Sequence, residues 1–151
     1  MIKCSLEIGE ARVEDIKGVI DVEVKSFKYP YTPMTFITLL NLFPNYFLVS
    51  KYCGKVVGYV TAALDKDGYG HIMSIAVDPE FRGMGIGKAL IRAVESRLRR
   101  DGVKGVRLEV AVSNSIAIKL YEGLGYKLVR VLRNYYPDGE DAYLMIKDLN
   151  Y

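Results

Sequence analysis

Residues 72–100 read IMSIAVDPEFRGMGIGKALIRAVESRLRR, and this stretch decides the fold of the chain. An apolar run comes first and ends at Asp78-Pro79. Three glycines at alternate positions follow, and apolar residues then recur at helical spacing. The pattern predicts a strand, a glycine loop and an amphipathic helix in direct succession. Such a loop presents unpaired backbone N–H groups at the positive end of a helix dipole, which favours the binding of an anion.

The glycine loop, residues 82–88, reads RGMGIGK. Its glycines allow the backbone to approach a ligand closely, and Arg82 and Lys88 add positive charge. The spacing does not fit the dinucleotide fingerprint, and Ala89 stands where a Walker loop needs a hydroxyl for magnesium. We therefore expect a pyrophosphate or phosphate ligand, although an ordinary strand-to-helix turn has the same local pattern.

Size and composition indicate one globular domain over residues 1–151. Half of the residues are hydrophobic and 26% are charged, which is ordinary for a globular protein. The net charge of +3 is too small to indicate nucleic acid as a partner, and no apolar run is long enough to cross a membrane. We therefore expect a soluble, cytoplasmic protein that binds neither nucleic acid nor a membrane.

The two cysteines, Cys4 and Cys53, stand far apart in the sequence and lack the spacing of metal ligands. Free thiols in a reducing compartment are the simpler interpretation of such a pair. The chain has one histidine, His71, and no cysteine or histidine stands near a glutamate in the manner of a metal site. We therefore expect no metal cofactor.

The whole chain alternates between strand and helix patterns in a definite order. The expected strands are residues 4–8, 46–52, 56–64, 71–77, 106–112, 126–136 and 141–147. The expected helices are residues 13–27, 33–43, 86–100 and 115–122. The resulting order β-α-α-β-β-β-α-β-α-β-β predicts an α/β fold with a mixed central sheet of about seven strands and about four flanking helices.

Two separated motifs resemble the GNAT acetyltransferases. Residues 82–87 resemble their Arg/Gln-x-x-Gly-x-Gly/Ala signature. The later stretch resembles the RimI-like protein N-terminal acetyltransferases in four short pieces: LEV at 108–110, SN at 113–114, LYE at 120–122 and LGY at 124–126. Residues 133–143 resemble the closing hairpin of the same subfamily, and Gly70-His71-Ile72 resembles its archaeal members. The resemblance spans nearly the whole chain and implies the GNAT fold.

The resemblance implies acetyl-coenzyme A as the cosubstrate, bound largely by the backbone. The pyrophosphate would lie on the glycine loop, and the amide arm and the developing oxyanion would meet the strand edge before it. The implied residues are Ile75, Ala76, Val77, Arg82, Gly83, Met84, Gly85, Ile86, Gly87 and Lys88. Asn114 is implied as a further contact to the coenzyme, whereas the sequence alone favours a helix cap at this position.

The resemblance also assigns chemistry to three side chains. Glu109 has the position of the general base, and Tyr121 has that of the general acid, whose protonated hydroxyl can donate to the departing sulfur. His71 is a second candidate base that would supplement or replace Glu109. Without the resemblance, Glu109 is an ordinary surface glutamate on a strand and Tyr121 an ordinary core aromatic residue.

Aromatic residues are candidates for the walls of a slot that binds a peptide N-terminus: Tyr29, Tyr31, Tyr135 and Tyr136. Their rings can pack while their hydroxyls seek hydrogen-bond partners, and packing alone is the alternative interpretation. Some relatives carry a glutamate in the loop after the first helix, where this chain has Lys28-Tyr29-Pro30. The sequence therefore does not support a mechanism that needs that glutamate.

We expect an enzyme that transfers the acetyl group to the α-amine of protein N-termini by direct attack in a ternary complex, with a ribosomal protein as one candidate acceptor. Neither motif contains a cysteine, which argues against a covalent acetyl-enzyme. One alternative acceptor is a lysine side chain, a polyamine or another small amine. A second alternative is a non-catalytic module that binds acetyl-coenzyme A as a ligand. The preferred first residue, the oligomeric state and any partner subunit stay open.

Overall fold

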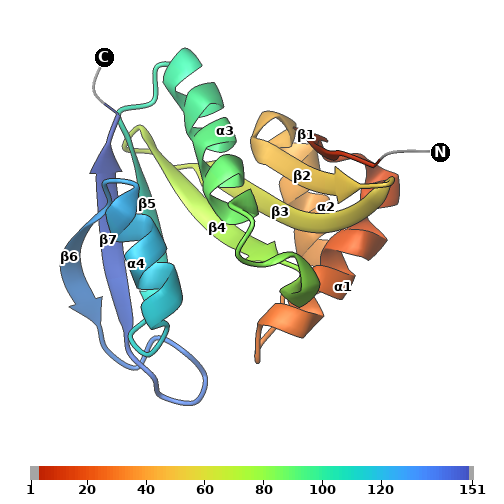
Figure 1. The fold of residues 1–151 in the computed structure, drawn as a ribbon. Helices are drawn as coiled ribbons and strands as arrows, with labels where there is room; N and C mark the ends of the chain where they lie inside the picture. Colours follow the sequence, from red (N-terminus) through yellow and green to blue (C-terminus); the bar gives the residue numbers. More distant parts are fainter. Residues whose placement is uncertain (1–3, 150–151) are drawn as a thin grey trace.

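The computed structural model describes residues 4–149, which form one seven-stranded mixed sheet with helices on both faces (Figure 1). The strand order is β1-β2-β3-β4-β5-β7-β6, with β4 and β5 parallel and the other neighbours antiparallel. The strands are β1 (Leu6–Glu10), β2 (Phe47–Tyr52), β3 (Lys55–Leu64), β4 (Tyr69–Val77), β5 (Gly105–Ala111), β6 (Lys127–Leu132) and β7 (Ala142–Asp148). The α-helices are α1 (Ile16–Ser26), α2 (Pro33–Leu42), α3 (Ile86–Arg100) and α4 (Ser115–Gly123). Short 3₁₀ turns are η1 (Val13–Asp15), η2 (Pro44–Tyr46) and η3 (Pro79–Phe81).

The α/β fold and the element order that the sequence predicts are confirmed. The helix cap expected at Asn114 is present, because its side chain accepts a hydrogen bond from the backbone of Ala117. Thr32 caps α2 in the same way, by accepting one from the backbone of Thr35. Pro33 occupies the first turn of α2, where its missing N–H costs nothing. Local sequence therefore fixes where these two helices begin.

The end of β6 differs from the prediction, because the strand stops at Leu132 rather than at residue 136. Asn134 has a φ of 52°, which breaks the extended conformation. The N–H groups of Tyr135 and Tyr136 then both donate to the Glu140 carbonyl, at 3.1 Å each. The residues expected at the end of this strand therefore belong to a compact β6–β7 loop.

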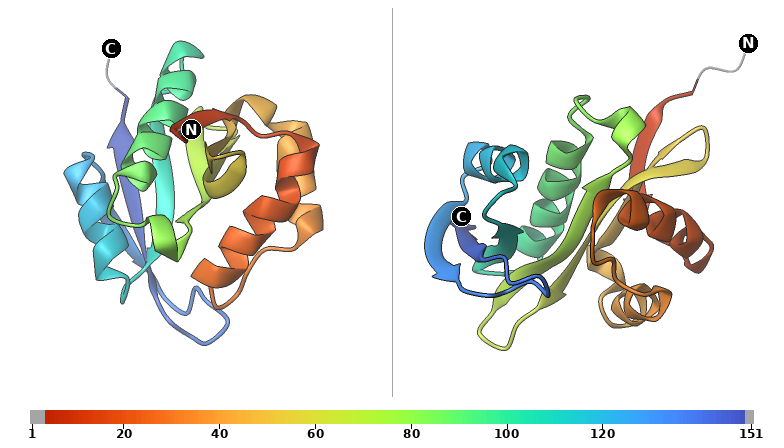
Figure 2. Two further views of the ribbon diagram at one scale, coloured as in Figure 1. Left: turned by 45° about the vertical axis from the view of Figure 1, so that its right-hand side comes forward. Right: turned by 90° about the horizontal axis from the view of Figure 1, so that it is seen from below.

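The two faces of the sheet are covered by different helices (Figure 2). Helices α3 and α4 cover one face, whose buried side chains include Leu90, Ile91, Val94, Leu98, Val60, Ile72, Val106 and Leu108. Helices α1 and α2 cover the other face, whose buried side chains include Val19, Val22, Phe36, Leu39, Phe47, Val49 and Tyr59. Burial of such apolar side chains, about 1.5–3 kcal/mol each, holds the layers together. Within residues 4–149, no helix is long and apolar enough to cross a membrane.

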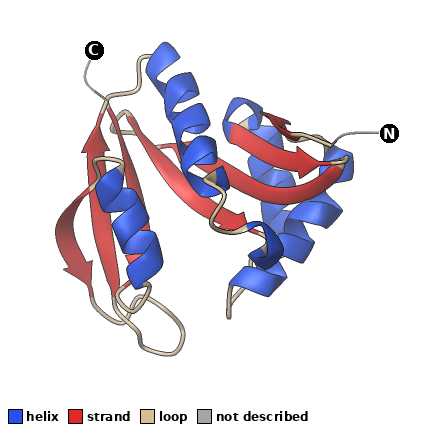
Figure 3. Cartoon of the chain, in the orientation of Figure 1, coloured by secondary structure: helices blue, strands red, loops and turns tan. Residues whose placement is uncertain are grey.

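Strands β4 and β5 pair only between Tyr69–His71 and Gly105–Arg107 and then separate (Figure 3). Beyond these segments, β4 continues beside β3 and β5 continues beside β7, so a gap opens between residues 72–77 and 108–111. Backbone groups along the margins of this gap have no partner strand, and unpaired N–H and C=O groups can bind a ligand or water. The gap is the feature of the fold that positions the candidate site.

A bulge lies in β4 beside the point where the strand leaves β5. The β3 register passes from Ser74 to Ile72 and leaves Met73 without a partner on β3. Beyond the bulge, Ser74 and Ala76 face α1 and α2. Ile75 and Val77 pack under α3.

The expectation of two separate free cysteines is wrong, because Cys4 and Cys53 form a disulfide. Strand β1 begins two residues later than predicted and pairs antiparallel with β2, with Leu6 opposite Tyr52. This register brings Cys4 beside the turn after β2, and the two Cα atoms are 5.1 Å apart, within the usual range for a disulfide. The residues are 49 positions apart in sequence but neighbours across paired strands. The two cysteines therefore do not indicate a reducing compartment.

Candidate active site

The glycine loop joins η3 to α3 and adopts the conformation that its glycines predict. Gly83 and Gly85 have φ values of 81° and 79°, in the left-handed region that side-chain-bearing residues rarely adopt. A β-carbon at either position would meet no atom within 4 Å, so both glycines face open space. Gly85 is the N-cap of α3 and provides no side-chain cap. The first-turn N–H groups of α3 are therefore available to an anion.

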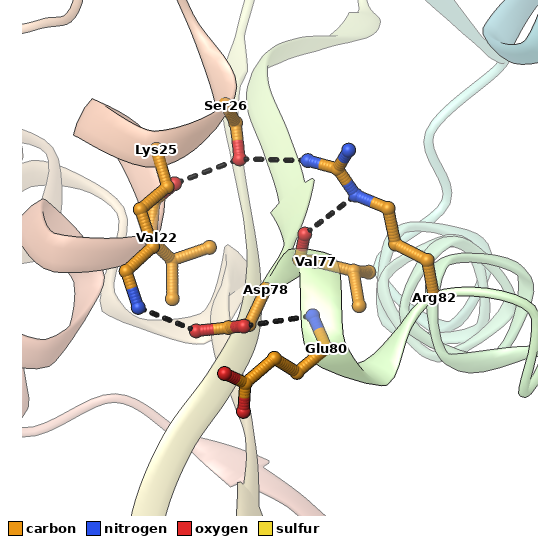
Figure 4. A network of polar contacts seen from close by, with 7 residues as sticks. All are labelled: Val22, Lys25, Ser26, Val77, Asp78, Glu80 and Arg82. Atoms are coloured by element: carbon orange, nitrogen blue, oxygen red, sulfur yellow. Dashed lines mark hydrogen bonds and ion pairs between the residues drawn. The ribbon is translucent and has the colours of Figure 1, made fainter.

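Arg82 ties the glycine loop to the end of α1 (Figure 4). Its Nε donates to the Val77 carbonyl at 3.0 Å, and its Nη2 donates to the Ser26 hydroxyl at 3.3 Å. The Ser26 hydroxyl in turn donates to the Val22 carbonyl at 2.7 Å, within α1. The guanidinium group thus already links three segments of the protein.

Asp78 adds a second link between this loop and α1 (Figure 4). Its Oδ2 accepts from Lys25 Nζ and its Oδ1 accepts from the Glu80 N–H, each at 3.0 Å. Burial acts to raise the pKa of Asp78, but the Glu80 N–H and the Lys25 ammonium outweigh it and the net shift is downward. The carboxylate is therefore charged at neutral pH and holds the loop entrance against α1.

The other predicted coenzyme residues lie along the gap or at the start of α3. The side chains of Ile75 and Val77 pack in one core and that of Ala76 in the other, so their contribution at the gap is backbone. Met84 is 57% exposed on the loop. Asn114 stands on the opposite margin, just after β5, where its Oδ1 accepts from the Ala117 N–H at 3.2 Å. The cap function is thus present whether or not Asn114 also contacts the coenzyme.

Glu109 and His71 meet at the point where β4 and β5 separate. His71 is the last paired residue of β4, and Glu109 lies two residues beyond the last paired residue of β5. Their Nε2 and Oε1 atoms are 2.6 Å apart, and the side chains are 17% and 13% exposed. An ionised carboxylate can only accept, so opposite such a group Nε2 carries the proton of this contact. The two candidate bases therefore form one hydrogen-bonded unit.

Tyr121 combines packing with a protonated hydroxyl. The residue is 7% exposed on α4, and its ring packs edge-on against Tyr126 with centroids 6.0 Å apart. Burial, with a smaller effect of Tyr136, raises the pKa of Tyr121 above its usual range. The hydroxyl therefore keeps its proton at neutral pH, and the two interpretations of this residue are compatible.

Three of the four tyrosines predicted for the acceptor slot gather around Glu109. The Tyr135 hydroxyl donates to Glu109 Oε1 at 3.4 Å. Burial and then the charge of Glu109 raise the pKa of Tyr135 and that of Tyr136 to about 12. Burial, with Glu23 and Glu109, also raises the pKa of Tyr31. The fourth, Tyr29, is 44% exposed and its ring lies under Lys28 Nζ, 5.5 Å from the ring centroid.

The loops that carry these tyrosines are joined to each other and to the sheet. Lys28 of the α1–α2 loop pairs with Asp138 of the β6–β7 loop, Nζ to Oδ2 at 3.6 Å. The Tyr31 hydroxyl donates to the Met73 carbonyl at 3.3 Å. Glu140 accepts hydrogen bonds from the Ser113 hydroxyl and from its N–H, which ties the β6–β7 loop to the end of β5. The two tyrosine-bearing loops are therefore tied to each other, to β4 and to the end of β5.

Glu23 contacts one of the predicted site residues but was not itself among the residues predicted from the sequence. This residue is 2% exposed, and its Oε2 accepts the Tyr31 N–H at 2.8 Å. A signal was present, because Glu23 falls seven residues after Ile16 and four after Val19, on the buried stripe of α1. A charged residue on such a stripe needs hydrogen-bond partners inside the protein.

Comparison with known proteins identifies the family. Residues 16–126 match the model of the acetyltransferase (GNAT) family. An N-alpha-acetyltransferase of Sulfurisphaera tokodaii is 38% identical, with 94% of this chain and 92% of that protein covered. The ribosomal protein bS18-alanine N-acetyltransferase of Escherichia coli is 32% identical, with 91% and 94% covered. The crystal structure of Ard1 from Thermoplasma volcanium has a TM-score of 0.93 and 33% identity, with 97% and 99% covered. The chain therefore belongs to the GNAT family of acetyl-coenzyme A-dependent acetyltransferases.

Proposed function

We propose that the whole chain, as one N-acetyltransferase domain, transfers the acetyl group of acetyl-coenzyme A to the α-amine of protein N-termini. The observation that carries this proposal is the Glu109 carboxylate at the opening between β4 and β5, hydrogen-bonded to His71 and to Tyr135. In this proposal, a glycine loop suited to a phosphate group lies on one side of the carboxylate, and a slot walled by tyrosines lies on the other side. The α-amine acceptor is supported by the names of relatives from Sulfurisphaera tokodaii and Escherichia coli.

In this proposal the coenzyme lies in the gap and on the glycine loop. The first-turn N–H groups of α3 and those of the loop bind the pyrophosphate, and Arg82 and Lys88 add positive charge. The backbone of residues 75–77 binds the amide arm. The left-handed glycines that face open space and the uncapped start of α3 support this fit.

Glu109 is the proposed general base, acting together with His71. A free α-amine has a pKa of about 8, so most acceptor molecules carry a proton that must be removed near neutral pH. The carboxylate takes that proton directly, or through His71, whose Nδ1 takes it while Nε2 gives its own proton to Glu109. The hydrogen bond of 2.6 Å between the two side chains supports a shared role.

The amine nitrogen then attacks the thioester carbonyl carbon, forming the C–N bond. The negative charge that develops on the carbonyl oxygen is stabilised by backbone N–H groups along the gap. The C–S bond breaks, the departing thiolate takes the proton of the Tyr121 hydroxyl, and the second proton lost by the acceptor nitrogen restores that hydroxyl through solvent. The raised pKa of Tyr121 keeps its hydroxyl protonated at neutral pH, so it is available to donate to the sulfur.

The test is acetylation of a set of short peptides with varied first residues, analysed by mass spectrometry. Each peptide also carries an internal lysine, and a matched set has a blocked N-terminus. The proposal predicts acetylation of the free α-amine and no reaction of the blocked set. A ribosomal-protein N-terminus beginning with alanine belongs in the set, because one relative is named for that acceptor.

Two outcomes would contradict the proposal. If the blocked peptides are acetylated on lysine, or if added polyamines are the better acceptors, the acceptor is not an N-terminus. If no amine reacts although acetyl-coenzyme A binds, the chain is a binding module under these conditions. An active parent whose Glu109 and Tyr121 variants are inactive would exclude that second case.

A further inference from the structure

Glu23 is a buried carboxylate outside the proposed reaction, and it accepts three hydrogen bonds. Its Oε1 accepts from the hydroxyls of Tyr59 and Ser74, the latter at 3.0 Å. Its Oε2 accepts from the Tyr31 N–H at 2.8 Å. The carboxylate thus connects α1 to strands β3 and β4 and to the α1–α2 loop.

The partners of Glu23 differ from those of the other deeply buried glutamate, Glu95. Glu95 is 3% exposed and accepts from the Tyr126 hydroxyl at 2.7 Å and from the Lys147 ammonium at 2.9 Å. Within residues 4–149, Glu23 is in contact with neutral donors only. Burial of a charge without an opposite charge is costly, so the neutral hydrogen bonds must compensate for it.

The hydrogen bonds of Glu23 stabilise one wall of the proposed acceptor slot. The Tyr31 N–H is fixed by Glu23, and the Tyr31 ring packs edge-on against Phe36 with centroids 5.9 Å apart. The Tyr31 hydroxyl then reaches the carbonyl of Met73, the bulge residue of β4. Glu23 therefore sets the position of the backbone from which the Tyr31 side chain extends to the β4 margin of the gap, where the charge of Glu109 acts on its hydroxyl.

We propose that Glu23 is a positioning residue for the acceptor: its buried carboxylate fixes the main chain of Tyr31 and so the width of the slot beside Glu109. This inference rests on the proposed function in one respect, namely that the slot receives the acceptor. The coenzyme side is separate, because no contact of Glu23 involves the glycine loop within the described residues. Loss of the carboxylate should therefore affect the acceptor and leave the coenzyme unaffected.

The test compares Glu23→Met with Glu95→Met, which removes the other buried carboxylate at the same depth. Both variants lose stability, but only Glu23→Met raises the KM for the acceptor peptide, by about tenfold, with the KM for acetyl-coenzyme A unchanged. Hydrogen exchange of residues 27–32 accelerates in Glu23→Met and not in Glu95→Met. Glu23→Gln rescues most of the effect, because its amide oxygen can accept the Tyr31 N–H and both hydroxyls can accept from its NH2 group.

A milder variant covers the case in which Glu23→Met does not fold. Ser74→Ala combined with Tyr59→Phe removes both hydroxyl donors and leaves the Tyr31 contact, and it raises the peptide KM by about threefold. The inference is overturned if neither variant changes the peptide KM more than Glu95→Met does, or if the exchange of residues 27–32 is unaltered. Should the parent enzyme acetylate only lysine side chains, the proposed function fails, and the same comparison with that lysine acceptor decides the role of Glu23.

Discussion

The two sides of the gap between β4 and β5 are built from different parts of the chain. On the glycine-loop side, the available groups are backbone N–H groups, and Gly83 and Gly85 leave open space above them. On the other side, the available groups are side chains, among them Glu109 and Tyr135. A site made of backbone is sensitive to any added β-carbon and insensitive to most side-chain changes, whereas a site made of side chains has the opposite sensitivity. Substitutions on the two sides should therefore separate the two substrates.

The largest effect is expected on the side-chain side, from Glu109→Gln. Loss of a general base typically costs about 10²- to 10⁴-fold, so kcat should fall by that factor while the KM for acetyl-coenzyme A stays within about twofold. Steady-state kinetics with a peptide acceptor measures both values. Glu122→Gln, on the exposed surface of α4, is the matched control and should behave like the parent.

A variant of His71 in the same assay tests whether the proton reaches Glu109 directly or through His71. If Glu109 accepts the proton through His71, His71→Phe reduces kcat nearly as much as Glu109→Gln, and the double variant is no worse than the single ones. If Glu109 acts directly, the His71 variant keeps most of its activity. Parent-like activity of Glu109→Gln would refute the assignment of the base altogether.

The next effect is expected on the backbone side, from Gly85→Ala. A β-carbon at a φ of 79° is strained and also intrudes on the open space above the loop, so the KM for acetyl-coenzyme A should rise by about tenfold. Gly102→Ala is a close control, because Gly102 has a φ of 77° and equally open surroundings after α3. Both variants should lose about 1–2 kcal/mol of stability, measured by denaturant unfolding. Equal KM values for acetyl-coenzyme A in the two variants would contradict a coenzyme-binding role of the glycine loop.

A smaller effect is expected from Tyr135→Phe, which removes one hydrogen bond to Glu109 and leaves the ring. Tyr135 is 48% exposed and its hydrogen bond competes with water, so kcat/KM for the peptide should fall by only about fivefold, without change in the KM for acetyl-coenzyme A. Tyr52→Phe is the control, because Tyr52 is similarly exposed on β2. An effect on the coenzyme instead of the peptide would show that the two sides are not independent.

The smallest effect is a dependence of stability on alkaline pH. The pKa of Tyr135 and that of Tyr136 are raised to about 12 in the folded protein, against about 10 in an unfolded chain. Above pH 10 the unfolded chain therefore binds fewer protons than the folded protein, and the free energy of unfolding falls as pH rises from about 10 to about 12. Thermal unfolding across this range measures the fall, which should be smaller in Tyr135→Phe. Backbone amides do not titrate in this pH range, so the backbone of the glycine loop does not contribute to the fall in the free energy of unfolding.

Local sequence patterns predicted the glycine-loop side of the gap well. The alternate glycines of residues 82–88 and the apolar spacing of α3 lie within one short stretch, so strand, loop and helix follow from neighbouring residues. The order of strands and helices could be predicted for the same reason. The crossover around α4 is less regular, because β7 lies between β5 and β6 and pairs antiparallel with both.

Contacts between distant segments could not be predicted in the same way. The disulfide depends on the register of β1 against β2, and the Lys28–Asp138 pair depends on two loops that meet only in the folded protein. Tyr31 reaches the Met73 carbonyl at the margin of the gap through a contact across 42 positions in sequence, and its backbone N–H is bound by Glu23 of α1. Of these contacts, only that of Glu23 had a signal in the sequence, because a charged residue on the apolar stripe of α1 needs partners inside the protein.

If the cosubstrate fills the gap as proposed, the short β4–β5 pairing links its binding to the lifetime of the protein. Where the two strands separate, the sheet is continuous only through three residue pairs and the packing of α3 above them. A cosubstrate that fills the gap binds the folded state alone and adds about 2.7 kcal/mol of stability at a hundredfold excess over Kd. Proteolysis in cells follows the population of opened molecules, so less enzyme is degraded when acetyl-coenzyme A is plentiful. The amount of the enzyme would then rise and fall with the supply of its own acetyl donor.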